Sequence, residues 1–206
     1  MHRVFLIILK IFDYFYQKKI FKFLNRKVRS IDFFFDVGAH RGETIKIYLN
    51  NFKINNIYSF EPIKDNFEIM IKKKDNYSKM FPETKINIEC LALGSENIKK
   101  KIKFLDESSS STLKNINSES SYFKKKNKFL FKKNLKNFYT EVIINQITLR
   151  NYLIKNKIKK IDFLKIDTEG SEFDVLIGAE EFLQNIHFII FEHHYHDMLK
   201  KNYTFS

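Results

Sequence analysis

Short apolar runs alternate with stretches of helical pattern along most of the chain. Strands are predicted over residues 31–37, 57–60, 86–91, 100–105, 141–147, 161–166 and 188–192. Helices are predicted over residues 43–50, 64–74, 149–156 and 172–183. This alternation is typical of βαβ units, so we expect one α/β domain, over residues 31–206, with a mostly parallel sheet and flanking helices. A length of 206 residues suits a single domain of this kind.

Two stretches depart from the alternation. Residues 1–30 are rich in aromatic residues and lysine, and charges at Lys10 and Asp13 interrupt the apolar run before it could span a membrane. We predict an amphipathic helical extension that packs on the domain; a cover over an acceptor site and a peripheral membrane contact are the alternatives. Residues 106–139 are crowded with Ser, Lys and Asn without a period, which predicts a long mobile loop.

A glycine-containing turn follows the first predicted strand. Residues 36–44 read D-V-G-A-H-R-G-E-T. Gly38 permits backbone angles that a side chain forbids and lets a ligand approach the main chain, and Gly42 lets the next helix start close to the strand. A three-glycine fingerprint would receive a pyrophosphate. Two glycines with an acid fit a methyl donor, which has no phosphate, although a purely structural turn is the alternative.

An acidic residue ends the second predicted strand, in the string F-E-P at 60–62. Glu61 could accept hydrogen bonds from both hydroxyls of a ribose, and Pro62 turns the chain at the sheet edge. Because ligands of open parallel sheets bind at the carboxyl ends of the strands, Gly38 and Glu61 should converge on one site. Ala92 and Leu93, at the exit of the third strand, could lie against an adenine ring or simply pack.

These strings resemble the FkbM family of methyltransferases. The resemblance rests on D-V-G-A-H-R-G-E-T, F-E-P, A-L-G-S, the Ser-Ser-Thr stretch at 110–112 and K-I-D-T-E-G-S-E-F-D-V-L-I-G-A at 165–179. It implies a Rossmann-like class I fold, S-adenosylmethionine as methyl donor, and a hydroxyl acceptor on a sugar of a polysaccharide or glycolipid, or on a natural product. The matching donor-binding positions are Asp36, Gly38, Gly42 and Glu61, and we assign Ala39 and Thr44 of the same string to that site.

The sequence departs from the pattern of this class near its end. Methyltransferases of this kind usually continue past the fifth strand, but only residues 195–206 remain here. We therefore expect a fold shortened at its C-terminus. An uncovered sheet edge would invite association, so the N-terminal helix or a second subunit in a homo-oligomer could cover it.

Transfer of a methyl group to a hydroxyl requires positioning and a group that takes the proton. By resemblance, Asp167, Glu169 and Glu172 form an acidic cluster after the fourth strand, and Asp167 is our first catalytic candidate. Glu192 and His193 follow the neighbouring strand and are the second choices. Glu169 and Glu172 could instead cap the following helix. We predict no metal, because no ligand spacing indicates one. A metal site is the alternative, and its competent ligands are Asp167, Glu169, Glu192, His193, His194 and His196.

The net charge of +13 raises a nucleic-acid function, but the lysines are scattered among asparagines, as in an AT-biased composition. An Asn/Asp-Pro-Pro-aromatic motif is absent after the fourth strand, so we expect no specific nucleic acid, and a nucleic-acid methyltransferase stays an alternative. A non-catalytic binding protein on the same scaffold is another. The single cysteine, Cys90, excludes an intramolecular disulfide, favours the cytoplasm, and is predicted to be a small core residue in a strand.

Overall fold

The computed structural model describes residues 19–28, 30–104, 111–112 and 140–191. Three stretches lie outside the described residues: residues 1–18 of the predicted N-terminal extension, most of the predicted loop over 106–139, and the segment from residue 192 onward. Everything below concerns the described part of the chain.

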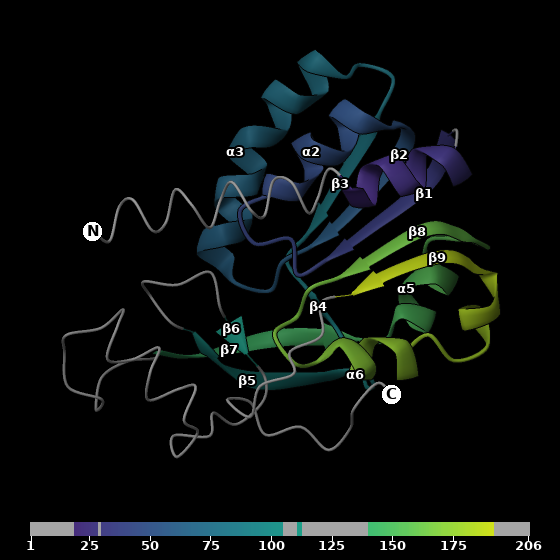
Figure 1. Ribbon diagram of the computed structural model, residues 1–206. Helices are drawn as coiled ribbons and strands as arrows, with labels where there is room; N and C mark the ends of the chain where they lie inside the picture. The colour runs from purple at the N-terminus through teal and green to yellow at the C-terminus, as the bar shows by residue number, and fades with distance from the viewer. Residues whose placement is uncertain (1–18, 29, 105–110, 113–139, 192–206) are drawn as a thin grey trace, which may run out of the picture.

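Five parallel strands form the central sheet (Figure 1). They are β1 (Ser30–Val37), β2 (Lys53–Phe60), β3 (Lys85–Glu89), β8 (Ile161–Ile166) and β9 (Ile186–Phe191). Their order is β3-β2-β1-β8-β9. The chain adds β2 and β3 on one side of β1 and later adds β8 and β9 on the other side, so the strand order reverses between β1 and β8. The predicted α/β fold with a mostly parallel sheet is confirmed.

Helices cover both faces of this sheet. They are α2 (Glu43–Asn51), α3 (Lys64–Met80), α5 (Leu149–Lys155) and α6 (Glu172–Ile177), and a 3₁₀ helix, η2, spans Glu180–Asn185. Figure 1 shows α2 and α3 on one side and α5 and α6 on the other. Adjacent phenylalanines of β1 separate the two cores, because successive side chains of a strand point to opposite faces. Phe34 packs in the cluster with α2, and Phe35 packs in the cluster with α5.

The second half of the N-terminal extension contacts the domain. Residues 19–27 are helical, and Phe21, Leu24 and Val28 are buried in the same core as α2. Packing on the domain is the arrangement that we expected for this extension, and the division of the chain at residue 30 stays a prediction.

A second, smaller sheet lies beside the first and was not predicted. It consists of β4 (Ala92–Leu93), β5 (Ile98–Phe104), β6 (Ser111–Thr112) and β7 (Thr140–Ile147), in the order β4-β7-β5-β6. β5 runs antiparallel to β7. Ile102 and Ile144 point from its inner face into a small buried cluster with Ile63 and Ala92. Through Ile63, this cluster connects the second sheet with the turn that follows β2.

Four predicted elements are wrong in their extent, and two of them are longer than predicted: β2 already begins at Lys53, and α3 runs to Met80. The helix predicted over 172–183 stops at Ile177, and the 3₁₀ helix η2 takes its place from Glu180, whose φ of 48° departs from α-helical geometry. The strand predicted over 86–91 stops at Glu89. Cys90 lies in the bend before β4 and is only half-buried, so its predicted place in a buried strand is also wrong.

Asp162 ties together the N-terminal ends of two neighbouring strands. Its Oδ2 accepts hydrogen bonds from the backbone amides of Asp32 (2.8 Å) and Phe33 (2.9 Å). Its Oδ1 lies 3.2 Å from both Lys160 Nζ and His187 Nδ1. We expect Asp162→Ala to lower the free energy of unfolding by about 1–3 kcal/mol in urea denaturation, because two amides lose their acceptor in a mostly buried place.

The matched control for Asp162→Ala is Glu83→Ala. Glu83 pairs with Lys53 at 3.7 Å, but both side chains are largely exposed. Removing an exposed pair should leave the urea midpoint unchanged. Equal midpoints for the two variants would contradict the role given to Asp162.

Candidate active site

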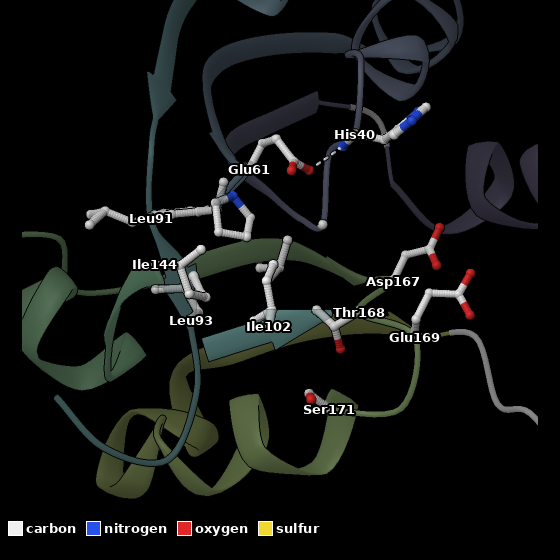
Figure 2. A pocket seen from close by; sticks show the side chains of 15 residues that line it. His40, Glu61, Leu91, Leu93, Ile102, Ile144, Asp167, Thr168, Glu169 and Ser171 are labelled. Atoms are coloured by element: carbon white, nitrogen blue, oxygen red, sulfur yellow. Dashed lines mark hydrogen bonds between the residues drawn. The ribbon is translucent and has the colours of Figure 1, made fainter. Parts of the chain in front are cut away.

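A pocket opens at the carboxyl ends of β1, β2 and β8, at the point where the strand order reverses (Figure 2). Its empty volume is about 620 Å³, part of it open to solvent. It is lined by Val37, Gly38, His40, Phe60, Glu61, Pro62, Leu91, Ala92, Leu93, Ile102, Ile144, Asp167, Thr168, Glu169 and Ser171. Strands of both sheets therefore contribute to its wall.

The turn after β1 follows the pocket edge because Gly38 adopts a left-handed conformation, with φ of 80°. The backbone amides of Gly38 and Ala39 both donate to the carbonyl oxygen of Phe60 at 3.0 Å. A Cβ on Gly38 would lie 1.9 Å from the carbonyl oxygen of Asp167. Only glycine lets the ends of β1, β2 and β8 approach this closely.

The carboxylate of Glu61 is buried beside this turn. Its Oε2 accepts a hydrogen bond from the amide of His40, and its Oε1 accepts one from the amide of Ile63, both at 2.9 Å (Figure 2). Burial raises the pKa of Glu61 to about 7, although the amides of Ile63 and His40 and the side chain of Asn66 oppose the shift. The two amides and the Asn66 side chain leave only part of the acceptor capacity of the carboxylate unused, and this part can accept a hydrogen bond from a ligand in the pocket.

Two residues with side chains hold left-handed backbone conformations at the pocket. His40 has φ of 50° and Glu169 has φ of 51°. Such angles are uncommon for residues other than glycine, and they gather at functional sites because the surrounding structure must hold them. Both residues line the pocket, one after β1 and the other after β8.

A buried lysine organises the acidic side of the pocket. Lys165 Nζ lies 3.2 Å from Asp36 Oδ1 and 3.2 Å from Asp167 Oδ2. Asp36 and Lys165 face each other in the β1–β8 ladder, and the amide of Asp167 donates to the carbonyl of Val37 at 2.9 Å. Burial raises the pKa of Asp36 despite the nearby lysine. The lysine thus fixes one oxygen of Asp167, whose side chain borders the pocket.

The loop from β8 to α6 is braced from within by Glu172. This buried side chain accepts hydrogen bonds from the amide of Gly170 at 2.8 Å and from the hydroxyl of Thr168 at 3.4 Å. Glu172 therefore shapes the loop and is not among the residues that line the pocket. This is close to the structural role that the sequence left open for it.

The residues predicted for the site divide into three groups. Those that the structure brings together on the pocket wall are Gly38, Glu61, Ala92, Leu93 and Asp167. Those near the turn but off the wall are Asp36, Ala39, Gly42 and Thr44. Glu192 and His193 lie outside the described residues. Direct donor contacts for the second group, and catalytic roles for the third, stay predictions.

Several pocket residues escaped the sequence analysis. Ile102 and Ile144 form an apolar end with Leu91, and nothing in the local sequence of these two isoleucines distinguishes them from ordinary strand residues. Lys165 belongs to the string at 165–179, but no role was predicted for it. Lys165 and Asp167 are two residues apart at the end of β8, and this spacing could have indicated that the two side chains point to the same face of the sheet.

Comparison with known proteins assigns the family. The family described as "Methyltransferase FkbM domain" matches residues 36–205. The chain belongs to the FkbM methyltransferase family. No curated protein matches the sequence significantly. The chain is also similar to the crystal structure of a methyltransferase FkbM from Methylobacillus flagellatus KT, with 17% sequence identity and a TM-score of 0.43. That match covers 72% of this chain and 28% of the other, so this chain spans well under half of that relative.

Two further observations bear on the FkbM domain. In the described ranges, none of the helices has the length and apolarity to cross a membrane. The described residues also contain no group of three or more His, Cys, Asp or Glu side chains arranged to hold a metal ion. The acidic side of the pocket is instead neutralised in part by Lys165.

Proposed function

We propose that this chain is an S-adenosylmethionine-dependent O-methyltransferase. The observation that carries the proposal is the meeting of the Gly38 turn and the Glu61 carboxylate at one pocket edge, joined by the hydrogen bond from the His40 amide. A buried acid at the carboxyl end of β2 suits the ribose hydroxyls of the donor. The tight turn leaves room for the main chain to approach the rest of the molecule.

The acidic side of the pocket suits the reacting end of the donor. When bound, the donor supplies a methyl carbon that leaves its sulfonium sulfur, as a neutral thioether, and bonds to the acceptor oxygen, whose proton passes to a base. Asp167 presents one oxygen to Lys165, and its other oxygen is available to hold an acceptor hydroxyl in line and to take that proton. The left-handed backbone at Glu169 is held by the surrounding loop.

The acceptor that we propose is a hydroxylated compound, namely a sugar of a polysaccharide or glycolipid, or a natural product. Carboxylates at Asp167 and Glu169 would repel phosphate groups, which disfavours a nucleic acid at this end of the pocket. A cytoplasmic location and association into homo-oligomers are further proposals, as is a peripheral membrane contact through the N-terminal segment. Methylation of a nucleic acid would be indicated by strongly salt-dependent binding to generic RNA.

The proposal is tested by comparing donor binding with methyl transfer in Asp167→Asn. We expect the wild-type protein to bind S-adenosylmethionine in calorimetry and to transfer labelled methyl to one member of a panel of methyl glycosides. Asp167→Asn keeps the size of the side chain and an acceptor for Lys165, so donor affinity should change less than about tenfold. Transfer should fall by about 100-fold or more, as expected on loss of a general base.

The control for Asp167→Asn is Asp174→Asn, which changes an acid of α6 that does not line the pocket. This variant should keep both donor binding and transfer. A folded wild-type protein that binds no donor would defeat the enzyme proposal and favour a non-catalytic scaffold. Unchanged transfer in Asp167→Asn would remove Asp167 as the base.

A further inference from the structure

The ion pairs at the carboxyl ends of β1 and β8 run from the core of the protein to the pocket. The side chain of Asp36 is fully buried, that of Lys165 is 15% exposed, and that of Asp167 is 35% exposed. Among these three residues, Asp167 lines the pocket and the other two do not (Figure 2). The charges therefore lead from the interior of the sheet to the acid that we propose as the base.

Lys165 is the partner that the structure gives to the carboxylate of Asp36. Asp36 Oδ1 accepts a hydrogen bond from Lys165 Nζ at 3.2 Å, and Oδ2 has no hydrogen-bond partner among the described residues. Asp36 also lies off the pocket wall, so its carboxylate is not exposed to a donor there. Burying a carboxylate is costly unless it is paired, and here the pair holds the ammonium group of Lys165 in place.

Lys165 in turn restrains the side chain of Asp167. The backbone of Asp167 is fixed by β1, because its amide donates to the carbonyl oxygen of Val37 at 2.9 Å. That bond leaves the side chain free to turn about its own torsions. The 3.2 Å hydrogen bond from Lys165 Nζ to Asp167 Oδ2 removes this freedom and leaves the other oxygen for the acceptor hydroxyl.

We infer that Asp36 and Lys165 are positioning residues for the proposed base, Asp167. The inference rests on the proposed function and deepens it, because it gives two buried residues a part in the transfer step and none in holding the donor. A base must lie within hydrogen-bond reach of the proton that it takes, and a displacement of about 1 Å can lower the rate about 100-fold. Without Lys165, the carboxylate of Asp167 can rotate away from the acceptor hydroxyl.

The first test separates kcat from donor binding in Lys165→Met, which keeps an unbranched side chain and removes its charge. On the glycoside that the wild-type protein methylates, we expect kcat to fall by about 100-fold. Affinity for S-adenosylhomocysteine, measured by calorimetry on the full chain, should change less than about threefold, since Lys165 does not line the pocket. A fall in affinity with unchanged kcat would overturn the inference.

A second variant guards against a loss that comes from unfolding. Lys165→Met leaves the buried carboxylate of Asp36 unpaired, which destabilises the fold. The double variant Asp36→Asn/Lys165→Met removes both charges and should regain much of the midpoint of urea denaturation. Its kcat should stay as low as that of Lys165→Met, because neither substitution restores the contact with Asp167. Recovery of kcat together with the midpoint would show that Lys165 serves stability alone.

Action through Asp167 is tested by adding Asp36→Asn/Lys165→Met to Asp167→Asn. If the two buried residues work by placing this carboxylate, the combined variant should have a kcat within about threefold of that of Asp167→Asn alone, because residues that act as a unit are not additive. Losses that multiply would mean that Lys165 acts on the reaction independently of Asp167, and the inference would be wrong.

The single change Asp36→Asn tests the role of Asp36. A neutral amide holds the lysine less firmly than a carboxylate does, so kcat should fall by about tenfold while donor affinity stays within about threefold. Affinity lowered by about tenfold or more, with kcat unchanged, would instead make Asp36 a donor-binding residue. Ser59→Ala is the control on the neighbouring strand, since Ser59 is buried opposite Asp36 and its Oγ has no hydrogen-bond partner among the described residues. This variant should leave kcat and affinity unchanged.

A matched control for Lys165→Met lies at the amino ends of the same two strands. Lys160 Nζ lies 2.9 Å from Asp32 Oδ2 and 3.2 Å from Asp162 Oδ1, so it also bridges β1 and β8, but at the edge opposite the pocket. Lys160→Met should lower the urea midpoint and leave kcat and donor affinity unchanged. An equal fall of kcat in Lys160→Met would assign the loss to general loosening of the sheet and overturn the inference.

The wild-type protein distinguishes failure of the inference from failure of the proposed function. A folded wild-type protein that binds no donor, or that binds the donor and methylates no glycoside, defeats the proposed function, and the inference falls with it. An active wild-type protein whose kcat survives in both Lys165→Met and Asp36→Asn/Lys165→Met overturns the inference and leaves the proposed function standing.

Discussion

Replacing Gly38 by alanine is expected to abolish detectable donor binding and to lower the free energy of unfolding by roughly 3 kcal/mol. The left-handed backbone at this residue costs a side-chain-bearing residue about 1–2 kcal/mol by itself. A Cβ would in addition lie 1.9 Å from the carbonyl oxygen of Asp167. Backbone cannot yield as a flexible side chain does, so the ends of β1 and β8 must separate. Calorimetry with S-adenosylmethionine and urea denaturation measure the two effects.

Gly42→Ala provides the comparison, because Gly42 has a similar φ of 76°. Its Cβ would meet Met70 Cγ at 3.3 Å, a contact that a flexible side chain can relieve. We expect a loss of about 1–2 kcal/mol in stability, from the backbone angle, with donor affinity lowered less than tenfold. If Gly38→Ala resembles Gly42→Ala in both measurements, the close approach of Gly38 and Asp167 has no functional importance.

The centre of the fold was predictable because its determinants are local. The apolar run at β1 indicated a strand buried on both faces, the alternation of strands and helices indicated β8, and glycine after β1 indicated the turn. Parallel strands place their carboxyl ends at one edge, so the meeting of Gly38, Glu61 and Asp167 followed from topology alone. The place of the site could therefore be predicted without knowing which side chains fill the pocket.

The second sheet could not be predicted from the sequence because it depends on pairing between distant segments. β5 reads I-K-K-K-I-K-F and was predicted as a strand, but its partner β7 lies far along the chain. Pattern shows that a segment is extended, and it does not show which segment it pairs with. Ile102 and Ile144 were therefore missed, although each lies in a predicted strand.

The ion pair between Asp36 and Lys165 could also not be predicted from the sequence. Asp36 was assigned to the donor by resemblance, whereas the structure buries it completely against Lys165. The pair becomes visible only once β1 and β8 are in register, with Asp36 opposite Lys165. Asp36 can influence the donor through the position of the Gly38 turn that it precedes.

A second large effect is expected at Glu61, whose carboxylate accepts from the turn and, in the proposed function, from the ribose of the donor. Glu61→Gln keeps one carbonyl oxygen, but its amide group must face the N–H of His40 or Ile63, which are both donors. We expect donor affinity to fall by about 100-fold, because a hydrogen bond to a charged group contributes about 1.5–3 kcal/mol and the turn is disturbed as well. Calorimetry with S-adenosylmethionine measures the loss. Glu89→Gln is the control, since Glu89 ends the adjacent strand β3, accepts from Tyr152 and does not line the pocket.

The pH dependence of donor binding distinguishes a charged contact at Glu61 from a merely structural one. Burial raises the pKa of Glu61 to about 7, so the carboxylate is ionised above this value and protonated below it. Ribose hydroxyls donate best to the ionised form, and wild-type affinity should therefore be constant above pH 8 and fall up to tenfold per pH unit below pH 7. Glu61→Gln does not titrate, and its weaker affinity should stay flat between pH 6 and pH 8. A wild-type profile as flat as that of the variant would mean that the ribose is not held by this carboxylate, and the assignment of the donor site would fail with it.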